Sequence, residues 1–452
     1  MKLRRWLTPG IGIKRWLVVA FAGLLLLALA AAHVIRQATQ DLEPGGIAGV
    51  VLDLVTFQFL PYPIRGLLVG LVGGGLFLLG SLRLIRTLMA PFRSADGDQP
   101  LVEVIYQKRF LARGPRVVAI GGGTGLSTLL RGLKEHTSNL TAVVTVADDG
   151  GSSGMLRSEL GIPPVGDIRN CIAALADAEP LMSQLLQYRF PGTDAGGPNT
   201  GESGARLAEQ GGLRGHAVGN LLIAALTAVE GGDFEEGVRR MNRVLAVRGQ
   251  VVPVSPTPLT LHARLHGGEV IDGQSKIAGA IGIERVWLTP ADVAASEDAL
   301  AAIGEADLIV LGPGSLYTSL LPSLLLPQIR DALLASPAVR VYACNVATQR
   351  GETDGFDLAD HLEALVAHTS PGIVDVVLAN NRFSARVPEA WTEEPVRLRW
   401  PPSGAPGPRL VLEDIVDPDN AHHHDPERLA ASLFRLLDRE GSRRRAGVAR
   451  TA

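Results

Sequence analysis

Apolar residues are arranged in two different ways along the chain. Within residues 1–93 they form two long, nearly uninterrupted runs, at residues 16–35 and 66–82. Beyond residue 115 they form short runs, each followed by glycine or polar residues. Long runs are typical of membrane-spanning helices, and short runs bounded by turn residues are typical of buried strands. The pattern therefore predicts a membrane-inserted region followed by an α/β domain.

The long runs predict a hairpin of two transmembrane helices. At a rise of about 1.5 Å per residue, residues 16–35 would cross a hydrocarbon layer about 30 Å thick, and residues 66–82 are near the lower limit. Arginine and lysine gather before the first run and after the second, so the positive-inside rule puts both ends in the cytoplasm. A cleaved signal peptide is the alternative, which the second run disfavours. We expect a multi-pass protein of the cell membrane whose main domain is cytoplasmic.

Composition shifts along the chain predict where its regions begin and end. The expected regions are the membrane hairpin at 1–93, a linker at 94–115, the main ligand-binding domain at 116–400, and a C-terminal segment at 401–452 with a final helix and a basic tail. Domain boundaries fall where polar, glycine and proline residues interrupt the apolar pattern.

Five short apolar runs predict the strands of a parallel sheet. They cover residues 117–120, 141–146, 308–311, 339–343 and 374–378. Leucines at helical spacing follow the first run, so strand, turn and helix come in order. Strands that alternate with helices indicate a doubly wound, mostly parallel, Rossmann-like α/β sheet. Such sheets bind ligands at the carboxyl ends of their strands, so the loops after these runs should meet in one crevice.

Two glycine-rich loops follow predicted strands and precede predicted helices. Their residues are Gly121, Gly122, Gly123, Thr124, Gly125 and Leu126 in the first, and Gly312, Gly314 and Ser315 in the second. Glycine lets backbone N–H groups approach an anion, and a helix N-terminus adds a positive dipole end. Two such loops fit a diphosphate better than a single phosphate. A purely structural tight turn stays open, because the first loop lacks both the third glycine of a dinucleotide fingerprint and the lysine of a P-loop.

Adjacent carboxylates follow the second predicted strand. Asp148 and Asp149 precede a glycine and serine run that includes Ser152 and Ser153. Carboxylates beside phosphate-binding loops are typical ligands of Mg²⁺, so the pair is the candidate metal site. Two neighbouring carboxylates also repel each other, which favours a raised pKa and a role as a base for one of them. An Asx-type turn with solvated acids is the alternative.

Further polar residues follow other strands or precede helices. These candidates are Asp167, Arg169, Asn170, His216, Gly219 and Asn220, together with Asn345, Thr348 and Gln349. Arg169 is a planar donor suited to phosphate, whereas Asp167 is either a functional acid or an N-cap. His216 is either a proton donor or a structural histidine. The uncharged side chains after residue 344 suit a base or a sugar.

Charge and the remaining reactive residues exclude several functions. The net charge of −3 gives no basic face for nucleic acid, which we exclude as a partner. Cys171 and Cys344 are too far apart to suggest a zinc site or a disulfide framework. The tract at residues 422–424 consists of three histidines, and we expect it to be a solvated approach to the final helix.

The motifs resemble one family in particular. The matching blocks are residues 120–126, 145–154, 166–170, 215–216, 219–220, 312–319 and 345–353. In this order they are similar to the YvcK-type gluconeogenesis factor branch of the CofD-like family. Gln274 stands where the family pattern has Glu, and Ala347 and Arg350 replace Met and Pro.

The resemblance implies a Rossmann-like core that binds nucleotide sugars similar to UDP-N-acetylglucosamine. It also implies a regulatory role in gluconeogenic growth, cell shape and envelope precursor supply, exerted on a partner enzyme, with a homodimer left open. Related CofD enzymes transfer a phospholactyl group from a nucleotide diphosphate donor with magnesium. Their functional acids and arginine would correspond to Asp148, Asp149, Asp167 and Arg169. A nucleotide-sugar-binding regulator is thus the leading hypothesis and a transferase the second, while an NAD-dependent dehydrogenase is disfavoured by the missing third glycine.

Overall fold

The computed structural model describes residues 24, 28, 61, 64, 110–176, 180–191, 212–383, 393–400 and 407–451. The chain divides into two compact units, residues 1–107 and 108–452. All elements discussed below belong to the second unit. The expected boundaries of the linker and the C-terminal segment stay predictions.

The expectation of a membrane protein needs correction. Within the described part of the chain, the structure contains no helix with the length and apolar character needed to cross a bilayer. This finding contradicts the expected multi-pass placement in the cell membrane, which we withdraw. The runs at 16–35 and 66–82 themselves lie almost entirely outside the described residues. Run length and hydropathy, on which the expectation rested, are necessary conditions for a span but not sufficient ones.

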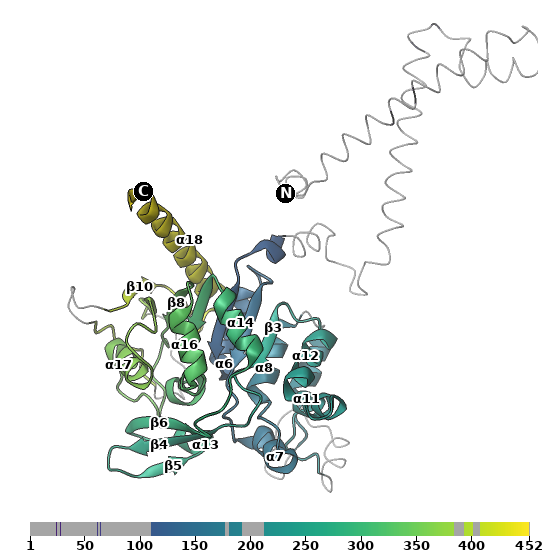
Figure 1. The fold of residues 1–452 in the computed structure, drawn as a ribbon, viewed down its shortest axis with the longest axis vertical. Coiled ribbons are helices and arrows are strands. Elements are labelled where there is room, and N and C mark those ends of the chain that lie inside the picture. Colours follow the sequence, from purple (N-terminus) through teal and green to yellow (C-terminus); the bar gives the residue numbers. More distant parts are fainter. Residues whose placement is uncertain are drawn as a thin grey trace, which may run out of the picture. The chain divides into compact units, whose positions relative to one another are not determined.

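The second unit is built on a seven-stranded sheet (Figure 1). Every strand pairing in it is parallel, and the order is β10-β9-β8-β7-β1-β2-β3. The strands are β1 (Val117–Gly121), β2 (Leu140–Val144), β3 (Gln250–Pro253), β7 (Leu308–Leu311), β8 (Val339–Ala343), β9 (Val376–Asn380) and β10 (Arg409–Glu413). The mostly parallel, Rossmann-like sheet is confirmed, although β3 and β10 were not predicted.

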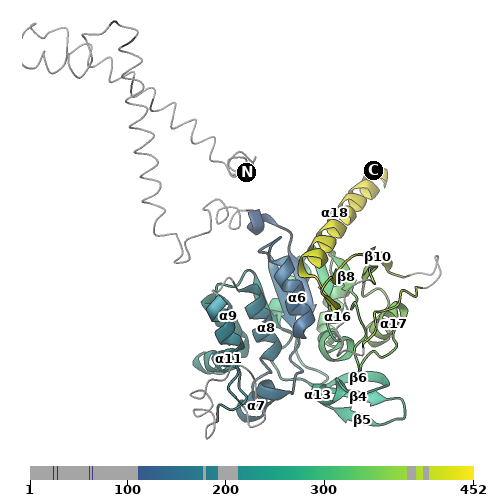
Figure 2. The same cartoon turned by 180° about the vertical axis from the view of Figure 1, so that it is seen from behind.

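Helices cover both faces of this sheet. One face carries α14 (Glu297–Glu305) and α16 (Pro327–Ala335), and the view from behind shows α6 (Gly123–Leu133), α8 (Gly166–Leu175) and α18 (Pro426–Thr451) on the other (Figure 2). The remaining longer helices are α7 (Gly151–Leu160), α9 (Pro180–Gln187), α11 (Val218–Val229), α12 (Phe234–Val244) and α17 (Leu358–His368). The short turns are η2 (Leu111–Arg113), α13 (Gln274–Ile277), η3 (Leu316–Leu320) and α15 (Leu321–Leu324).

Two smaller β elements accompany the main sheet. An antiparallel sheet contains β4 (Thr260–Leu265), β5 (Val270–Asp272) and β6 (Ile283–Thr289), in the order β5-β4-β6. A hairpin near the C-terminus pairs β11 (Val416–Asp417) with β12 (Asn420–His424). Neither was predicted from the sequence.

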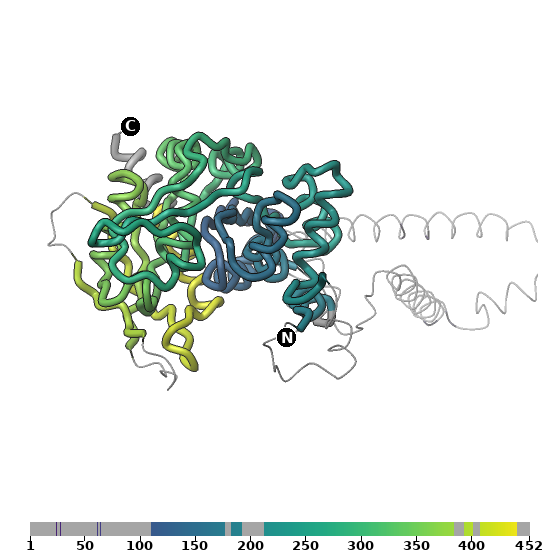
Figure 3. Tube along the Cα trace, turned by 90° about the horizontal axis from the view of Figure 1, so that it is seen from below, coloured from purple at the N-terminus to yellow at the C-terminus, as the bar shows by residue number. Residues whose placement is uncertain are grey.

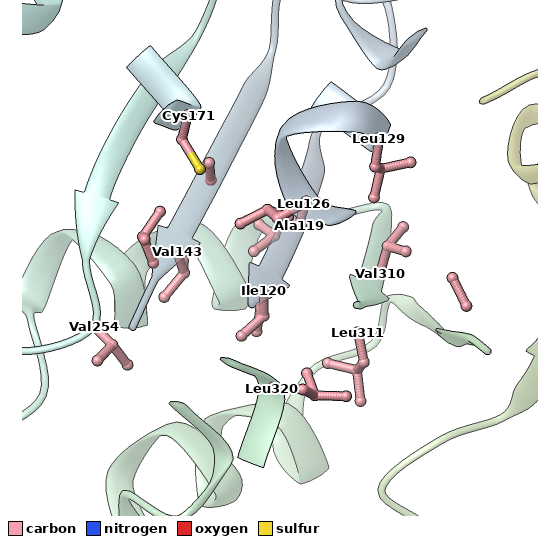
Figure 4. Packing of buried hydrophobic residues seen from close by; sticks show 14 of the residues in the cluster. Ala119, Ile120, Leu126, Leu129, Val143, Cys171, Val254, Val310, Leu311 and Leu320 are labelled. Atoms are coloured by element: carbon pink, nitrogen blue, oxygen red, sulfur yellow. The ribbon is translucent and has the colours of Figure 1, made fainter. Parts of the chain in front are cut away.

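The core lies around β1 and its neighbours, which are buried along their whole length. Figure 4 shows Ile120 of β1 close to Leu311 of β7, with Leu320 beside Leu311. On the face behind, α6 and α18 approach so closely that a Cβ at Gly132 would lie 1.9 Å from the Pro426 carbonyl oxygen. Continuous burial explains why these strands are uniformly apolar rather than alternating.

The strand order reverses between β1 and β7. From β1 the chain moves outward through β2 to β3, and after β7 it moves the other way through β8, β9 and β10. The register pairs Ile120 with Leu311, so β1 and β7 end level with each other. In doubly wound sheets the crevice beyond such a reversal is where ligands bind.

Candidate functional site

The two glycine-rich loops lie side by side at the reversal point. A Cβ at Gly125 would lie 2.7 Å from the Pro313 carbonyl oxygen, and one at Gly314 would lie 3.2 Å from the Gly122 carbonyl oxygen. Glycine is needed at Gly125 because its neighbour there is backbone, which cannot move aside. The expectation that both loops meet in one crevice is therefore confirmed.

A pocket of about 250 Å³ opens between these loops. Its lining comes from five parts of the chain: Gly122, Gly123, Thr124, Gly125 and Thr128; Pro313, Gly314, Ser315 and Ser319; Asn345, Val346, Ala347, Thr348 and Gln349; Glu393; and His422, His423 and His424. Seen from below in Figure 3, the blue segment after β1 lies centrally, with the yellow C-terminal segment beside it. The lining offers backbone amides, hydroxyls, side-chain amides and imidazoles, with neither lysine nor arginine among these residues.

The first loop presents the N-terminus of α6 to the pocket. Its N-cap residue, Gly122, supplies no side-chain acceptor, and Gly123 takes the left-handed conformation with φ of 65°. The Gly123 N–H donates to the Asp167 carboxylate. The first four N–H groups of an α-helix lack intrahelical acceptors, so the Thr124 and Gly125 amides are oriented to receive an anion.

The second loop differs from the expectation. The helix after it, η3, is a single turn of π-helix, and its Tyr317 and Thr318 N–H groups donate to the Glu352 carboxylate at 3.1 and 3.3 Å. A side chain of the protein thus already occupies the helix start that was expected to hold a phosphate. Asn345 fixes the same loop, because its side chain accepts from the Gly314 N–H at 3.1 Å and donates to the Gly314 carbonyl at 2.9 Å. Gly314 and Ser315 line the pocket, whereas Gly312 does not.

Asp148 and Asp149 point to different partners. The exposed Asp149 accepts hydrogen bonds from the Ser275 N–H at 2.8 Å and the Ser275 hydroxyl at 2.7 Å. The half-buried Asp148 accepts from the Gly150 N–H at 2.9 Å, which is the Asx-type turn considered as an alternative, and from the Ser153 hydroxyl. Burial raises the pKa of Asp148, and the charge of Asp149 adds to that rise. Within the described residues, no group of three or more histidine, cysteine or acidic side chains is arranged to hold a metal ion.

Asp167 lies against the first loop. Its Oδ2 atom is buried against Gly122, where a Cβ would come within 2.4 Å of it, and it has no hydrogen-bond partner among the described residues. Burial raises the pKa of Asp167 to about 6, and the nearby charge of Asp148 contributes to the rise. The N-cap position of α8 belongs to Val165, so the interpretation of Asp167 as an N-cap is wrong.

A buried polar cluster next to Asp167 contains most of the remaining candidates. The Arg169 Nη2 atom donates to the Asn170 Oδ1 atom at 2.9 Å, and its Nε atom has no partner among the residues described. Gly219 brings α11 against Arg169, because a Cβ at Gly219 would lie 2.8 Å from the Arg169 Cδ atom. The Asn220 side chain is buried and its Oδ1 atom likewise has no partner within the described chain.

His216 is held by a buried serine. The Ser152 Oγ atom accepts from the Asn220 Nδ2 atom at 3.0 Å and the Ala217 N–H at 3.3 Å, and lies 3.2 Å from the His216 Nδ1 atom. Since both acceptor positions of the hydroxyl are occupied, we assign its hydrogen to the Nδ1 atom and the ring hydrogen of His216 to Nε2. These contacts favour the structural interpretation of His216. Leu126 is fully buried in the core and offers its backbone alone.

Sequence reasoning missed several contributors to the pocket and its walls, among them Glu393, Glu352 and the histidine tract. Glu352 lies within the block at residues 345–353, but no local pattern shows that its carboxylate turns inward. The histidine tract was expected to be solvated, yet His424 is buried, and its Nε2 atom donates to the Cys344 carbonyl at 3.1 Å. Burial lowers the pKa of His424 to about 4, so this ring is neutral. The apolar residue Ala421 within the β12 sequence was the signal that this segment packs inward.

Comparison with known proteins agrees with these features. The family described as 2-phospho-L-lactate transferase CofD matches residues 117–398. The Bacillus subtilis protein named gluconeogenesis factor is 43% identical over 72% of this chain and 99% of its own length. A Nostoc sp. protein is 42% identical over 95% of this chain and 92% of its own length.

A solved structure has the same fold. The crystal structure of a UPF0052 family member from Bacillus halodurans is 42% identical, with a TM-score of 0.63 over 71% of this chain and 99% of that one. The family match covers the glycine loops, the acidic residues and Glu352, and ends before the histidine hairpin. The chain belongs to the CofD-like family, with the proteins named gluconeogenesis factors among its relatives.

Proposed function

We propose that the protein is a regulatory protein that binds a nucleotide sugar similar to UDP-N-acetylglucosamine. Its role would lie in gluconeogenic growth, cell shape and envelope precursor supply, through an enzyme of amino-sugar or envelope precursor synthesis that recognises the loaded state. The names of the relatives support the gluconeogenic part of this proposal. The ligand class, the partner and a homodimer are the parts that experiments must test.

The observation that carries the proposal is the paired glycine loops around one pocket. The Thr124 and Gly125 amides at the start of α6 and the hydroxyls of Ser315 and Ser319 suit the oxygens of a diphosphate. Thr348 and Gln349 lie on the same pocket wall and offer donors and acceptors for a sugar or a base. This donor set recognises phosphate through oriented dipoles rather than through lysine or arginine.

Calorimetry on the full chain tests the proposal. We expect UDP-N-acetylglucosamine to bind and to be recovered intact after incubation with magnesium, whereas NAD should not bind. Turnover of the sugar nucleotide, or binding of NAD alone, would reject the regulatory function. UDP and N-acetylglucosamine, titrated separately, show whether affinity resides mainly in the diphosphate, as the amide-rich lining predicts.

A magnesium-dependent phospholactyl transferase is the second candidate. The arrangement of Asp148 and Asp167 favours it, because the charge of Asp148 contributes to the raised pKa of Asp167, and Asp167 has a buried oxygen without a partner in the described chain. In this second proposal these two acids, rather than Asp149, would hold the cation, which would neutralise charge on a diphosphate donor. A carboxylate oxygen such as Asp167 Oδ2 is a typical ligand of Mg²⁺.

Asp148→Asn tests this second candidate. We expect the substitution to weaken nucleotide binding with magnesium present about tenfold more than binding with EDTA, because only the metal-linked part needs the carboxylate. Titrations of wild type and variant under both conditions measure this. Asp149→Asn is the matched control, since that carboxylate is bonded to Ser275. Equal losses with and without magnesium would remove Asp148 from the metal site.

A further inference from the structure

The carboxylate of Glu352 connects two walls of the pocket. Glu352 is 3% exposed and belongs to the loop between β8 and α17. Its Oε2 atom accepts from the Tyr317 and Thr318 N–H groups of η3. Its Oε1 atom accepts from the Thr318 hydroxyl and from the Gln349 Nε2 atom, the latter at 3.2 Å. One side chain thereby joins the wall at residues 312–319 to the wall at residues 345–349.

A carboxylate is the side chain that these donors require. All four contacts are donors, and an ionised carboxyl group has lone pairs for four of them on two oxygens. A glutamine would turn an NH₂ group toward one donor pair and leave those donors unsatisfied. Burying a charge is costly, so a glutamate at this position points to a requirement beyond filling the core.

We propose that Glu352 is the positioning residue that fixes the second glycine loop against the 345–349 loop and thereby sets the shape of the ligand pocket. The proposal rests on the function proposed above and adds how the site distinguishes its two glycine loops. Because the carboxylate already satisfies the start of η3, the ligand's phosphates are directed to the start of α6, at the Thr124 and Gly125 amides.

The surroundings of Glu352 make this contact sensitive to protonation. Burial raises the pKa of Glu352 to about 7, against the lowering effect of the bonds from Thr318 and Tyr317. Among the described residues the titratable Tyr317 also faces it, and burial raises the pKa of Tyr317 to about 12, so this hydroxyl stays neutral. His368 lies against the Tyr317 ring, and burial lowers its pKa. Below about pH 7 the protonated Glu352 becomes a donor and must release one of its four partners.

The test measures the affinity of the full chain for UDP-N-acetylglucosamine and for inorganic pyrophosphate between pH 6 and 8.5. Wild type should bind more weakly as the pH falls through about 7, and Glu352→Gln should bind about tenfold more weakly at pH 8 with a flatter pH profile. Thr318→Val removes one donor and should produce a smaller loss. Glu305→Gln, at an exposed residue that pairs with Arg116 by the amino ends of β1 and β7, is the matched control and should leave both affinities unchanged.

Hydrogen exchange of the ligand-free protein separates this proposal from the proposed function. In Glu352→Gln, amides in residues 312–319 and 345–349 should exchange faster together, while those of β1 and β2 keep their protection. If wild type binds neither ligand, the proposed function fails. Hydrogen exchange of the two loops in Glu352→Gln still tests whether Glu352 holds them together. A folded Glu352→Gln with the wild-type pH profile, or with only one loop loosened, overturns the proposal. Should Glu352→Gln not fold, unchanged exchange and affinity in Thr318→Val overturns it.

Discussion

Two regions meet at Gly122, and they differ in how completely their polar groups are paired. On one side lies the glycine-loop pocket, where Asn345 and Glu352 satisfy the backbone groups of the second loop. On the other side lies the acidic cluster, which we define as Thr145, Asp148, Asp167, Arg169 and Asn220. Four of its buried atoms, Thr145 Oγ1, Asp167 Oδ2, Arg169 Nε and Asn220 Oδ1, lack partners among the described residues.

The second loop of the pocket is thus held in place by hydrogen bonds, whereas the acidic cluster buries charged and polar groups that destabilise the folded protein. Leaving a buried polar atom unsatisfied costs about 1–3 kcal/mol, so stability alone does not explain the acidic cluster. Groups that are expensive to bury are retained where a bound ligand or ion completes them. If the proposed function holds, the pocket would recognise the ligand, and any chemistry or metal binding would occur at the cluster.

The largest effect is expected for Gly125→Ala in the pocket. The new methyl group would collide with the Pro313 backbone, so the loops must separate, and we expect affinity for the nucleotide sugar to fall roughly a hundredfold. Calorimetry with UDP-N-acetylglucosamine measures this loss of affinity. The control is Gly304→Ala in α14, where a Cβ has open space around it. Unchanged affinity in a folded Gly125→Ala would show that the close approach of the loops is not needed for binding.

An intermediate effect is expected for Asp167→Asn in the cluster, on stability rather than affinity. The folded pKa of Asp167, about 6, lies above its ordinary value of 3.8, so the unfolded state ionises first and stability is lost as the pH rises between these values. Removing the charge should raise the free energy of unfolding by about 2 kcal/mol at pH 8 and by little at pH 3.5. Urea unfolding at the two pH values measures this. An equal gain in the free energy of unfolding at both pH values would mean that the Asp167 charge does not destabilise the folded protein.

The smallest effect is expected for Ser275→Ala at the outer edge of the cluster. It removes the hydroxyl bond to the exposed Asp149 while the Ser275 N–H bond remains, so the loss of stability should be about 0.5–1 kcal/mol. Thermal unfolding of variant and wild type gives the difference. A loss of stability much greater than this would mean that Asp149 belongs to the acidic cluster, from which we have left it out.

The sequence was sufficient for the elements whose pattern is local. The run at 117–120 and the glycines after it predict β1, its turn and α6, because burial on both faces makes a parallel strand continuously apolar. The edge strands β3 and β10 were missed, since β3 begins with exposed Gln250 and β10 is partly exposed throughout. Strands of this kind lack the strong signal of central ones.

Contacts made across long separations were beyond local pattern. The adjacency of Asp148 and Asp149 suggested a joint metal site, but the fold turns Asp149 toward Ser275 and leaves Asp148 near Asp167. The inward turn of Glu352 likewise depends on η3 lying opposite it. Side-chain direction at these positions is set by tertiary packing, which neither spacing nor composition encodes.

The pairing of β1 with β7 also determines when the pocket can form during synthesis of the chain. Residues 117–120 pair with residues 308–311, and the last wall of the pocket comes from residues 422–424. A nascent chain that has emerged only as far as β3 carries the first glycine loop without its counterpart, and closing so long a loop is slow. A ligand that binds in the pocket would therefore stabilise only chains that carry all of its walls, and would selectively protect them over shorter fragments.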